Sequence, residues 1–279
     1  MISLNKCFFL ITLLFTSFSI AQEALQEQFE FAKKLFEEEN YFDAVTEFKR
    51  LQFFDSTNSY VFVSNELIAL SYKNGGYFNE AIKYFTLAEI NAKDDNDLYR
   101  IKIEIIRVNI LRRTTDNALK LLDVLEMDVK FADKTEEINY WRGWAYIFSD
   151  EWDKAAEKFL KISPDHELSI LSKETHEKKY SVNFAKIASV ILPGSGQFYT
   201  GNYISGLLSF AWFALWGYIS VNAFVEDRIF DGFAVANFLW FRFYRGNIQN
   251  AEKFAVEKNL NITNEALYYL QNSYSGTKP

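Results

Sequence analysis

The sequence has few of the residues that build metal sites, disulfides and nucleophilic centres. Its 279 residues include one cysteine, Cys7, two histidines and three prolines. Cys7 lies in an N-terminal apolar run that we expect to be removed, so the mature chain would have no thiol for a disulfide, a nucleophile or a metal site. His166 and His176 lie ten positions apart in a charged segment, without the cysteines that a zinc site would need. We therefore expect no metal, no cofactor and no enzymatic activity.

Positive charge is also scarce, because 30 Lys and Arg stand against 37 Asp and Glu. Residues 23–183 carry 22 basic and 31 acidic side chains, a net charge of −9, whereas residues 184–279 carry 7 and 6, a net charge of +1. Nucleic-acid binding begins with a basic patch, so we expect no nucleic-acid partner. The composition, 49% hydrophobic and 18% aromatic, excludes a disordered chain.

The N-terminus has the features of an export signal. Lys6 precedes an apolar run over residues 7–20, and Ser19 and Ala21 are small residues at the −3 and −1 positions of a cleavage site. We predict a signal peptide over residues 1–21. The alternative is an uncleaved anchor helix, although the run is shorter than the roughly 20 residues that a membrane span needs.

Residues 23–164 contain about four internal repeats with a period of 37. Alanines recur at that interval, and each is followed four positions later by a large apolar residue and preceded twelve positions earlier by a residue that is small in three of the four repeats. The three sets are Ala44, Ala81, Ala118 and Ala155; Phe48, Phe85, Leu122 and Phe159; and Ala32, Ala69, Ile106 and Gly143. Residues four positions apart lie on one face of a helix, and the residues twelve positions earlier belong to a second helix that precedes each turn. The pattern predicts paired antiparallel helices that stack into an all-α solenoid.

This pattern resembles the tetratricopeptide repeat family over residues 25–164, although the family's period is about 34. Repeat three departs furthest, with Ile106 and Asn109 where the family has a small residue and an aromatic one. The resemblance implies that the first helix of each pair lines a groove that binds a peptide or a partner helix. Transferring the family's groove positions by register gives Lys33, Phe36, Glu66, Lys73, Arg100, Arg107, Tyr140 and Trp144.

Basic side chains are concentrated in residues 100–113, which carry five of them and one acid. Two interpretations stand. The groove could accept a carboxylate from a partner, because guanidinium groups match carboxylates in geometry. Alternatively, the segment is a solvated helix face whose charges pair with the acidic neighbouring repeats.

A charged linker over residues 165–183 leads into a membrane domain that we place at residues 184–256, before a C-terminal tail at 257–279. From residue 187 to residue 225, 39 consecutive positions lack Asp, Glu, Lys and Arg. After a break rich in glycine, Tyr203–Val225 is long enough to cross a bilayer core of roughly 30 Å. Residues 229–248 either cross back, completing a membrane hairpin, or form an interfacial or re-entrant element.

The break contains the string Pro-Gly-x-Gly-Gln-x-Tyr-x-Gly, which we interpret as a close-packed bend at membrane depth. Its motif residues are Pro193, Gly194, Gly196, Gln197, Tyr199 and Gly201. Together with the return arm that ends at residues 244–248, the string is similar to small two-transmembrane domains behind tetratricopeptide repeats in bacterial envelope proteins. That resemblance implies membrane attachment and carries no defined activity.

These features favour a noncatalytic, membrane-tethered adaptor of the bacterial cell envelope, whose exported repeats bind a protein partner on the periplasmic side. The alternative is a membrane-assembly or transport component whose hairpin forms a homo-oligomer. The orientation is in tension with the positive-inside rule, because Arg242 and Arg245 would then flank the hairpin on the exported side.

Overall fold

The computed structural model describes residues 22–279, and within that range the chain is all-helical, with no strand. The predicted all-α fold class is therefore confirmed. The predicted signal peptide lies outside the described residues. The chain divides into two compact units: the first comprises Met1–Ser169 together with Lys278 and Pro279, and the second comprises Ile170–Thr277.

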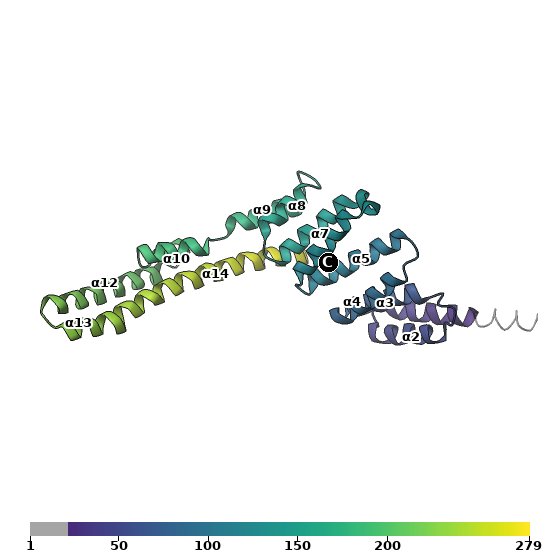
Figure 1. Cartoon of the computed structure of the whole chain (residues 1–279), viewed down its shortest axis with the longest axis horizontal. Helices are drawn as coiled ribbons and strands as arrows, with labels where there is room; N and C mark the ends of the chain where they lie inside the picture. Colours follow the sequence, from purple (N-terminus) through teal and green to yellow (C-terminus); the bar gives the residue numbers. More distant parts are fainter. Residues whose placement is uncertain (1–21) are drawn as a thin grey trace, which may run out of the picture. The chain divides into compact units, whose positions relative to one another are not determined.

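The first unit is a succession of helices that pack in sequence order (Figure 1). Its elements are helical residues 22–37, α2 (Tyr41–Phe54), α3 (Val61–Asn74), α4 (Phe78–Ile90), α5 (Asp95–Leu111), α6 (Thr115–Met127), η1 (Val129–Lys134), α7 (Thr135–Phe148) and α8 (Trp152–Leu160). Each of α2 to α7 packs against the α-helix that follows it, with η1 between α6 and α7. Helix α9 (Glu167–Lys178) begins in this unit and ends in the second.

The residues that recur every 37 positions form the core of this unit. The four alanines and the large apolar residues four positions after them are all 0% exposed. Ala32 and Phe48 lie in one buried cluster, and Ala69 and Phe85 lie in another. Small side chains thus stand where the helices of a pair approach each other, and large ones fill the space beside that contact.

The turns between paired helices follow the same interval. Glu39, Gly76, Arg113 and Asp150 all adopt positive φ, at 62°, 79°, 59° and 67°. After each of them, an N–H bonds to the carbonyl five residues earlier, as from Tyr77 to Tyr72 at 2.8 Å. This left-handed helix ending satisfies carbonyls that would otherwise lack donors. Only Gly76 adopts it without steric cost from a Cβ.

The loop between α2 and α3 is held by Asp55, which is 4% exposed. Its carboxylate accepts the Tyr60 N–H at 2.7 Å and the Thr57 hydroxyl at 2.8 Å. Burial by itself raises the pKa of Asp55, but these hydrogen bonds outweigh burial, and the net effect is a lowered pKa. The ionised carboxylate therefore organises this connection.

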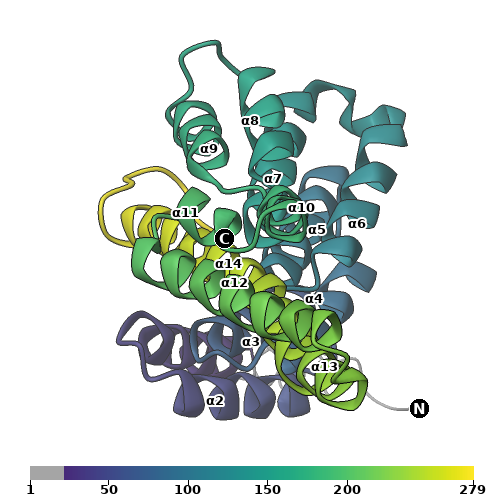
Figure 2. The same cartoon turned by 90° about the vertical axis from the view of Figure 1, so that its left-hand side faces the viewer.

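The second unit continues from α9 through α10 (Val182–Ile191), α11 (Ser195–Tyr199), α12 (Tyr203–Val225), α13 (Ile229–Val235), the π-helical turn η2 (Ala236–Trp240) and α14 (Phe241–Asn272). Helix α12 packs on α13, η2 and α14, while α10 packs on α14. Figures 1 and 2 both show α12 beside the α13–α14 segment. The boundary that we predicted at residue 256 falls inside α14, because that helix runs without interruption to Asn272.

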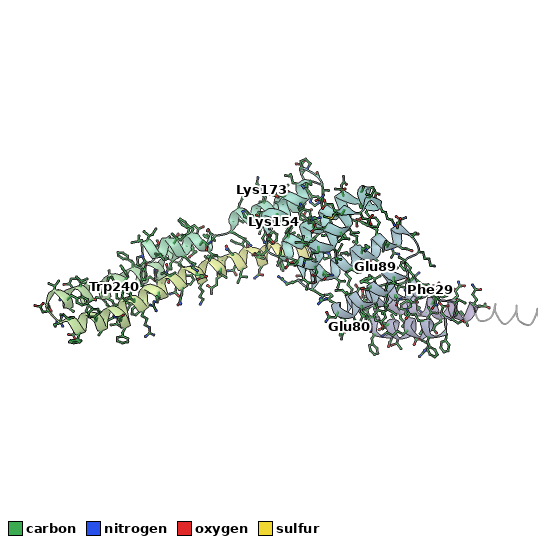
Figure 3. The ribbon with its side chains drawn as sticks, in the orientation of Figure 1. Phe29, Glu80, Glu89, Lys154, Lys173 and Trp240 are labelled. Atoms are coloured by element: carbon green, nitrogen blue, oxygen red, sulfur yellow. The ribbon has the colours of Figure 1, made fainter. Side chains whose placement is uncertain are left out.

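Within residues 22–279, α12 is the one helix that is long and apolar enough to cross a membrane. Its contact side is made of small residues. Gly217 faces the ring of Trp240 (labelled in Figure 3), which would lie 3.1 Å from a Cβ added there. The Ser220 hydroxyl donates to the Gly232 carbonyl at 3.1 Å. Large apolar side chains point outward, among them Ile204, Leu207, Tyr218 and Val225.

Candidate functional site

The predicted groove residues of repeats two and three form a network of alternating charges on α3 and α5. Lys73 pairs with Glu104 at 2.9 Å, and Glu104 also binds the Arg107 guanidinium. Arg100 pairs with Glu66 and, at 2.9 Å, with Asp97. The structure therefore brings Lys73 and Arg107 together through a shared carboxylate. These two basic groups have acidic partners within the unit itself.

The network changes the protonation chemistry of Lys73. Burial lowers the pKa of its ammonium, Arg107 lowers it further, and the facing Glu104 carboxylate opposes both. The net effect is a pKa below the ordinary value for lysine. A buried ammonium between a cation and an anion is held in one position, so Lys73 orients Glu104 more than it attracts a distant ligand.

Arg107 is the best-positioned donor of this surface. Its guanidinium lies over the Trp141 ring at 4.9 Å from the centroid, and it donates to the backbone carbonyl of Lys278 at 2.8 Å. Lys278 belongs to the same compact unit as the repeats. An arginine stacked on an aromatic ring and bound to a carboxylate is rigid, and a rigid guanidinium loses little entropy when it binds an acceptor. We call Lys73, Arg100, Glu104 and Arg107 the charged face.

The remaining predicted groove residues lie apart from the charged face. Lys33 and Phe36 belong to helical residues 22–37, and Lys33 lies 3.6 Å from Glu37. On α7, Tyr140 is half-buried and packs edge-on against Phe159, at 5.7 Å between centroids. Trp144 is 2% exposed, which makes it a core residue of that helix pair.

A second surface follows the same repeat register and was missed at the sequence level. Phe53, Ile90 and Met127 stand 37 positions apart near the ends of α2, α4 and α6, and they are 83%, 74% and 82% exposed. We call these three residues the apolar row. The 37-residue period could have revealed this row, because a large apolar residue recurs at a position where an exposed helix usually carries a polar one.

In the second unit, the glycine-rich string forms the centre of a buried polar cluster. Gln197 is 0% and Asn247 2% exposed. The Gln197 amide donates to both the backbone carbonyl and the side-chain oxygen of Asn247, each at 3.0 Å. Asn247 in turn accepts the Gly194 N–H at 2.8 Å and donates to the Ser189 carbonyl at 3.0 Å. The cluster joins α10, α11 and α14, which lie far apart in sequence.

The glycines of the string allow this close approach. Gly194 has φ 95°, and a Cβ there would overlap the carbonyl oxygen of Gly206. A Cβ on Gly196 would overlap the carbonyl oxygen of Ala185. Pro193 is buried beside them, while Gly201, at φ 77°, closes the short helix α11 in open space. The backbone thus turns sharply where these helices converge.

Tyr199 ties the string to the start of α10. Its hydroxyl accepts the Ser181 N–H at 3.0 Å, and its ring packs edge-on against Phe184 at 4.8 Å. The Ser189 hydroxyl completes the cluster, because it donates to Gln197 at 3.3 Å and accepts the Gly196 N–H at 3.0 Å. A buried network in which each amide and hydroxyl has a partner fixes one packing arrangement. The cluster therefore holds α10, α11 and α14 in one arrangement.

No group of three or more metal-ligating side chains occurs in the part of the chain that the structure describes. His166 lies against the Phe159 ring at 5.1 Å between centroids. Burial lowers its pKa, and Glu167 opposes that effect. Comparisons with known protein families, curated proteins and solved structures find no match for this chain.

Proposed function

We propose that this chain is a noncatalytic, membrane-tethered adaptor whose helix pairs bind a protein partner at a bacterial cell envelope. The observation that carries the proposal is α12, a 23-residue uncharged helix whose large side chains mostly face outward. In water, so much exposed apolar surface would be costly. In a bilayer, the same surface is solvated by lipid, and the helix length of about 34 Å spans the hydrocarbon core.

The proposal includes a second crossing by the α13–α14 segment, which completes a membrane hairpin. Support comes from the packing of α13 and η2 on α12 and from the exposed aromatics of that arm, such as Phe230, at 91% exposure, and Phe238, at 74%. Its polar residues lie near the ends of the predicted crossing: Asp231 pairs with Arg228 at 3.6 Å, and Arg242 is exposed. Charges at such positions can reach the headgroups.

The first unit supplies the proposed partner surface, and its resemblance to tetratricopeptide repeats belongs to this proposal. Equivalent residues of the four helix pairs recur along one surface, and solenoids form their extended binding surfaces in this way. The charged face and the apolar row are the two candidate contacts. A partner that buries the apolar row gains from the hydrophobic effect, while the charged face selects its orientation.

Membrane attachment is tested by fractionation and carbonate washing of cells that express the full chain or a chain ending at Tyr180. We expect the full chain to stay with membranes and the short chain to be released, because attachment through surface charge alone is screened and lost in this wash. Release of the full chain would refute the tether. A cysteine introduced at Asp227 then tests topology: it should react only with a membrane-permeant reagent if the repeats are exported.

Partner binding is tested by crosslinking in intact cells followed by purification. Retention of one partner by the full chain, and its loss when the charged face or the apolar row is changed, would support the adaptor. Recovery of homo-oligomers through the membrane unit, with no partner on the repeats, would favour the assembly component instead.

A further inference from the structure

A cleft in the second unit collects polar side chains that lack partners. It measures about 380 Å³ and lies between the first part of α12 and α14. Its polar lining comes from Ser205 and Ser209 on α12 and from Arg242, Asn250 and the Asn247 of the buried polar cluster on α14. The side chains of Ser205, Arg242 and Asn250 have no hydrogen bond or ion pair with any other described residue. This volume is at the lower end of the roughly 300–1,000 Å³ of ligand pockets.

Ser209 adds an oriented donor to the same cleft. Its hydroxyl oxygen accepts the Gln197 amide at 3.2 Å, which leaves its own proton available for another acceptor. Since Gln197 is fixed by the buried polar cluster, the Ser209 oxygen is fixed as well. The cleft therefore offers a guanidinium, two hydroxyls and an amide to a ligand rich in acceptor oxygens.

The charge around the cleft favours an anion. No Asp or Glu occurs between Asp231 and Glu252, and α12 carries no charged residue. Arg242 and Arg245 are the only charges in that stretch of the return segment. A cation beside a low-dielectric surface, with no carboxylate to neutralise it, attracts phosphate strongly.

One wall of the cleft is aromatic and continues into the outward apolar surface of α12. Trp212 stacks on Phe243 at 5.5 Å between centroids with an interplanar angle of 14°, and Trp216 stacks on Phe243 at 6.3 Å and 9°. Ser205 and Trp212 lie about 3 and 14 Å along α12 from its start, where a crossing helix passes from headgroups to acyl chains. Tryptophan prefers that level of a bilayer.

We propose that this cleft binds an anionic phospholipid. The phosphate oxygens accept hydrogen bonds from Arg242, Ser205, Ser209 and Asn250, and an acyl chain lies along the Trp212–Phe243 wall. The inference rests on the proposed membrane attachment and deepens it, because it names the lipid class that the membrane unit selects.

The test is native mass spectrometry of the detergent-purified full chain with phosphatidylglycerol or phosphatidylcholine of equal acyl chains. Both lipids carry the phosphate, but the choline of phosphatidylcholine would place a second positive charge near Arg242, so we expect about a tenfold preference for phosphatidylglycerol. Arg242→Gln should abolish the preference, and Arg242→Lys should keep part of it. Arg245→Gln is the matched control, since Arg245 does not line the cleft, and it should keep the preference.

Three results would overturn the inference: no preference in the wild-type chain, equal loss in the Arg242→Gln and Arg245→Gln variants, or displacement of the lipid by millimolar inorganic phosphate, which would indicate a site for free anions. Hydrogen exchange of α12 and α14 confirms that the variants keep the fold, and Ser205→Ala provides a second, uncharged variant that should weaken binding. Carbonate washing separates the two levels of the proposal. A chain that stays in the membrane without lipid preference refutes this inference alone, whereas release of the wild-type chain refutes the tether.

Discussion

Replacing Gly143 with alanine should destabilise the fourth helix pair, although alanine is the better helix former. A Cβ at Gly143 would lie 2.5, 2.6 and 2.8 Å from three ring atoms of Phe159, whereas ordinary contact begins at 3.4 Å. The ring would have to retreat by about 1 Å, the difference between these distances. It has no free space to do so, because Phe159 is 0% exposed and is stacked on His166 at 5.1 Å.

The size of the effect follows from two opposing terms. Overpacking of a filled core costs about 1–3 kcal/mol, and three simultaneous ring contacts place this site in the upper half of that range. Alanine in place of glycine inside a helix recovers about 1 kcal/mol. We therefore expect Gly143→Ala to lower the free energy of unfolding of the α7–α8 pair by about 1–2 kcal/mol.

Native-state hydrogen exchange of α7 and α8 peptides in the detergent-purified full chain measures this quantity locally. The matched comparison is Gly143→Ala in a Phe159→Leu background, where the clashing ring atoms are gone and the alanine should become stabilising by about 1 kcal/mol. A stabilising effect of Gly143→Ala in the wild-type background would refute the reasoning, since it would mean that the ring does not fill the space beside Gly143.

Three further predictions concern other positions. Gly76→Ala should destabilise the second helix pair by about 1 kcal/mol, because φ 79° disfavours a Cβ even where no atom lies within 4 Å. Gly76→Asn should destabilise it less, because asparagine tolerates this conformation better, and thermal unfolding of both variants measures the difference. The pKa of Asp55 lies below its ordinary 3.8, so the ionised carboxylate stabilises the fold above that pH, and this stabilisation is lost as the pH falls through the folded-state pKa. Asp55→Asn should therefore lower the free energy of unfolding at neutral pH by about 1 kcal/mol. It should also make the free energy of unfolding less dependent on pH in the acid range. Asn247→Ala should leave the Gly194 N–H without its acceptor, remove one acceptor of the Gln197 amide, and speed hydrogen exchange in α10 and α14 at least tenfold. Asn237→Ala, at an exposed position, should not have this effect.

The repeat core was predictable because its signal is local and periodic. A helix buries one face at a fixed residue spacing, so Ala81 and Phe85 indicate a buried helix face even when the partner helix is not known. The side-chain sizes at the two paired core positions also compensate for each other within a repeat. Gly143 is paired with the large Phe159, and the larger Ile106 is paired with the smaller Leu122. Packing at constant volume explains why the third repeat departs from the pattern and still has a buried core.

The polar cluster was predictable only as a bend. Its glycines indicated close approach, but the acceptor that holds Gln197 is Asn247, 50 residues later and on another helix. Hydrogen bonds between such distant positions leave no period in the sequence. The π-helical turn at Ala236–Trp240 and the continuation of α14 past residue 256 were missed for a related reason. Both depend on packing against neighbouring helices, which overrides local composition.

The two candidate partner surfaces should contribute unequally to binding. On the charged face, Arg107 already has Glu104 as a partner, so a new carboxylate exchanges one ion pair for another, a change worth about 0–1 kcal/mol near solvent. The three side chains of the apolar row are more than 70% exposed and gain about 1.5–3 kcal/mol each on full burial. Affinity should therefore depend mainly on the apolar row, and association rate and orientation on the charged face. Changing the three residues of the apolar row to serine should thus reduce partner capture more than changing Arg100 and Arg107 to alanine. The opposite order would show that the partner binds mainly to the charged face.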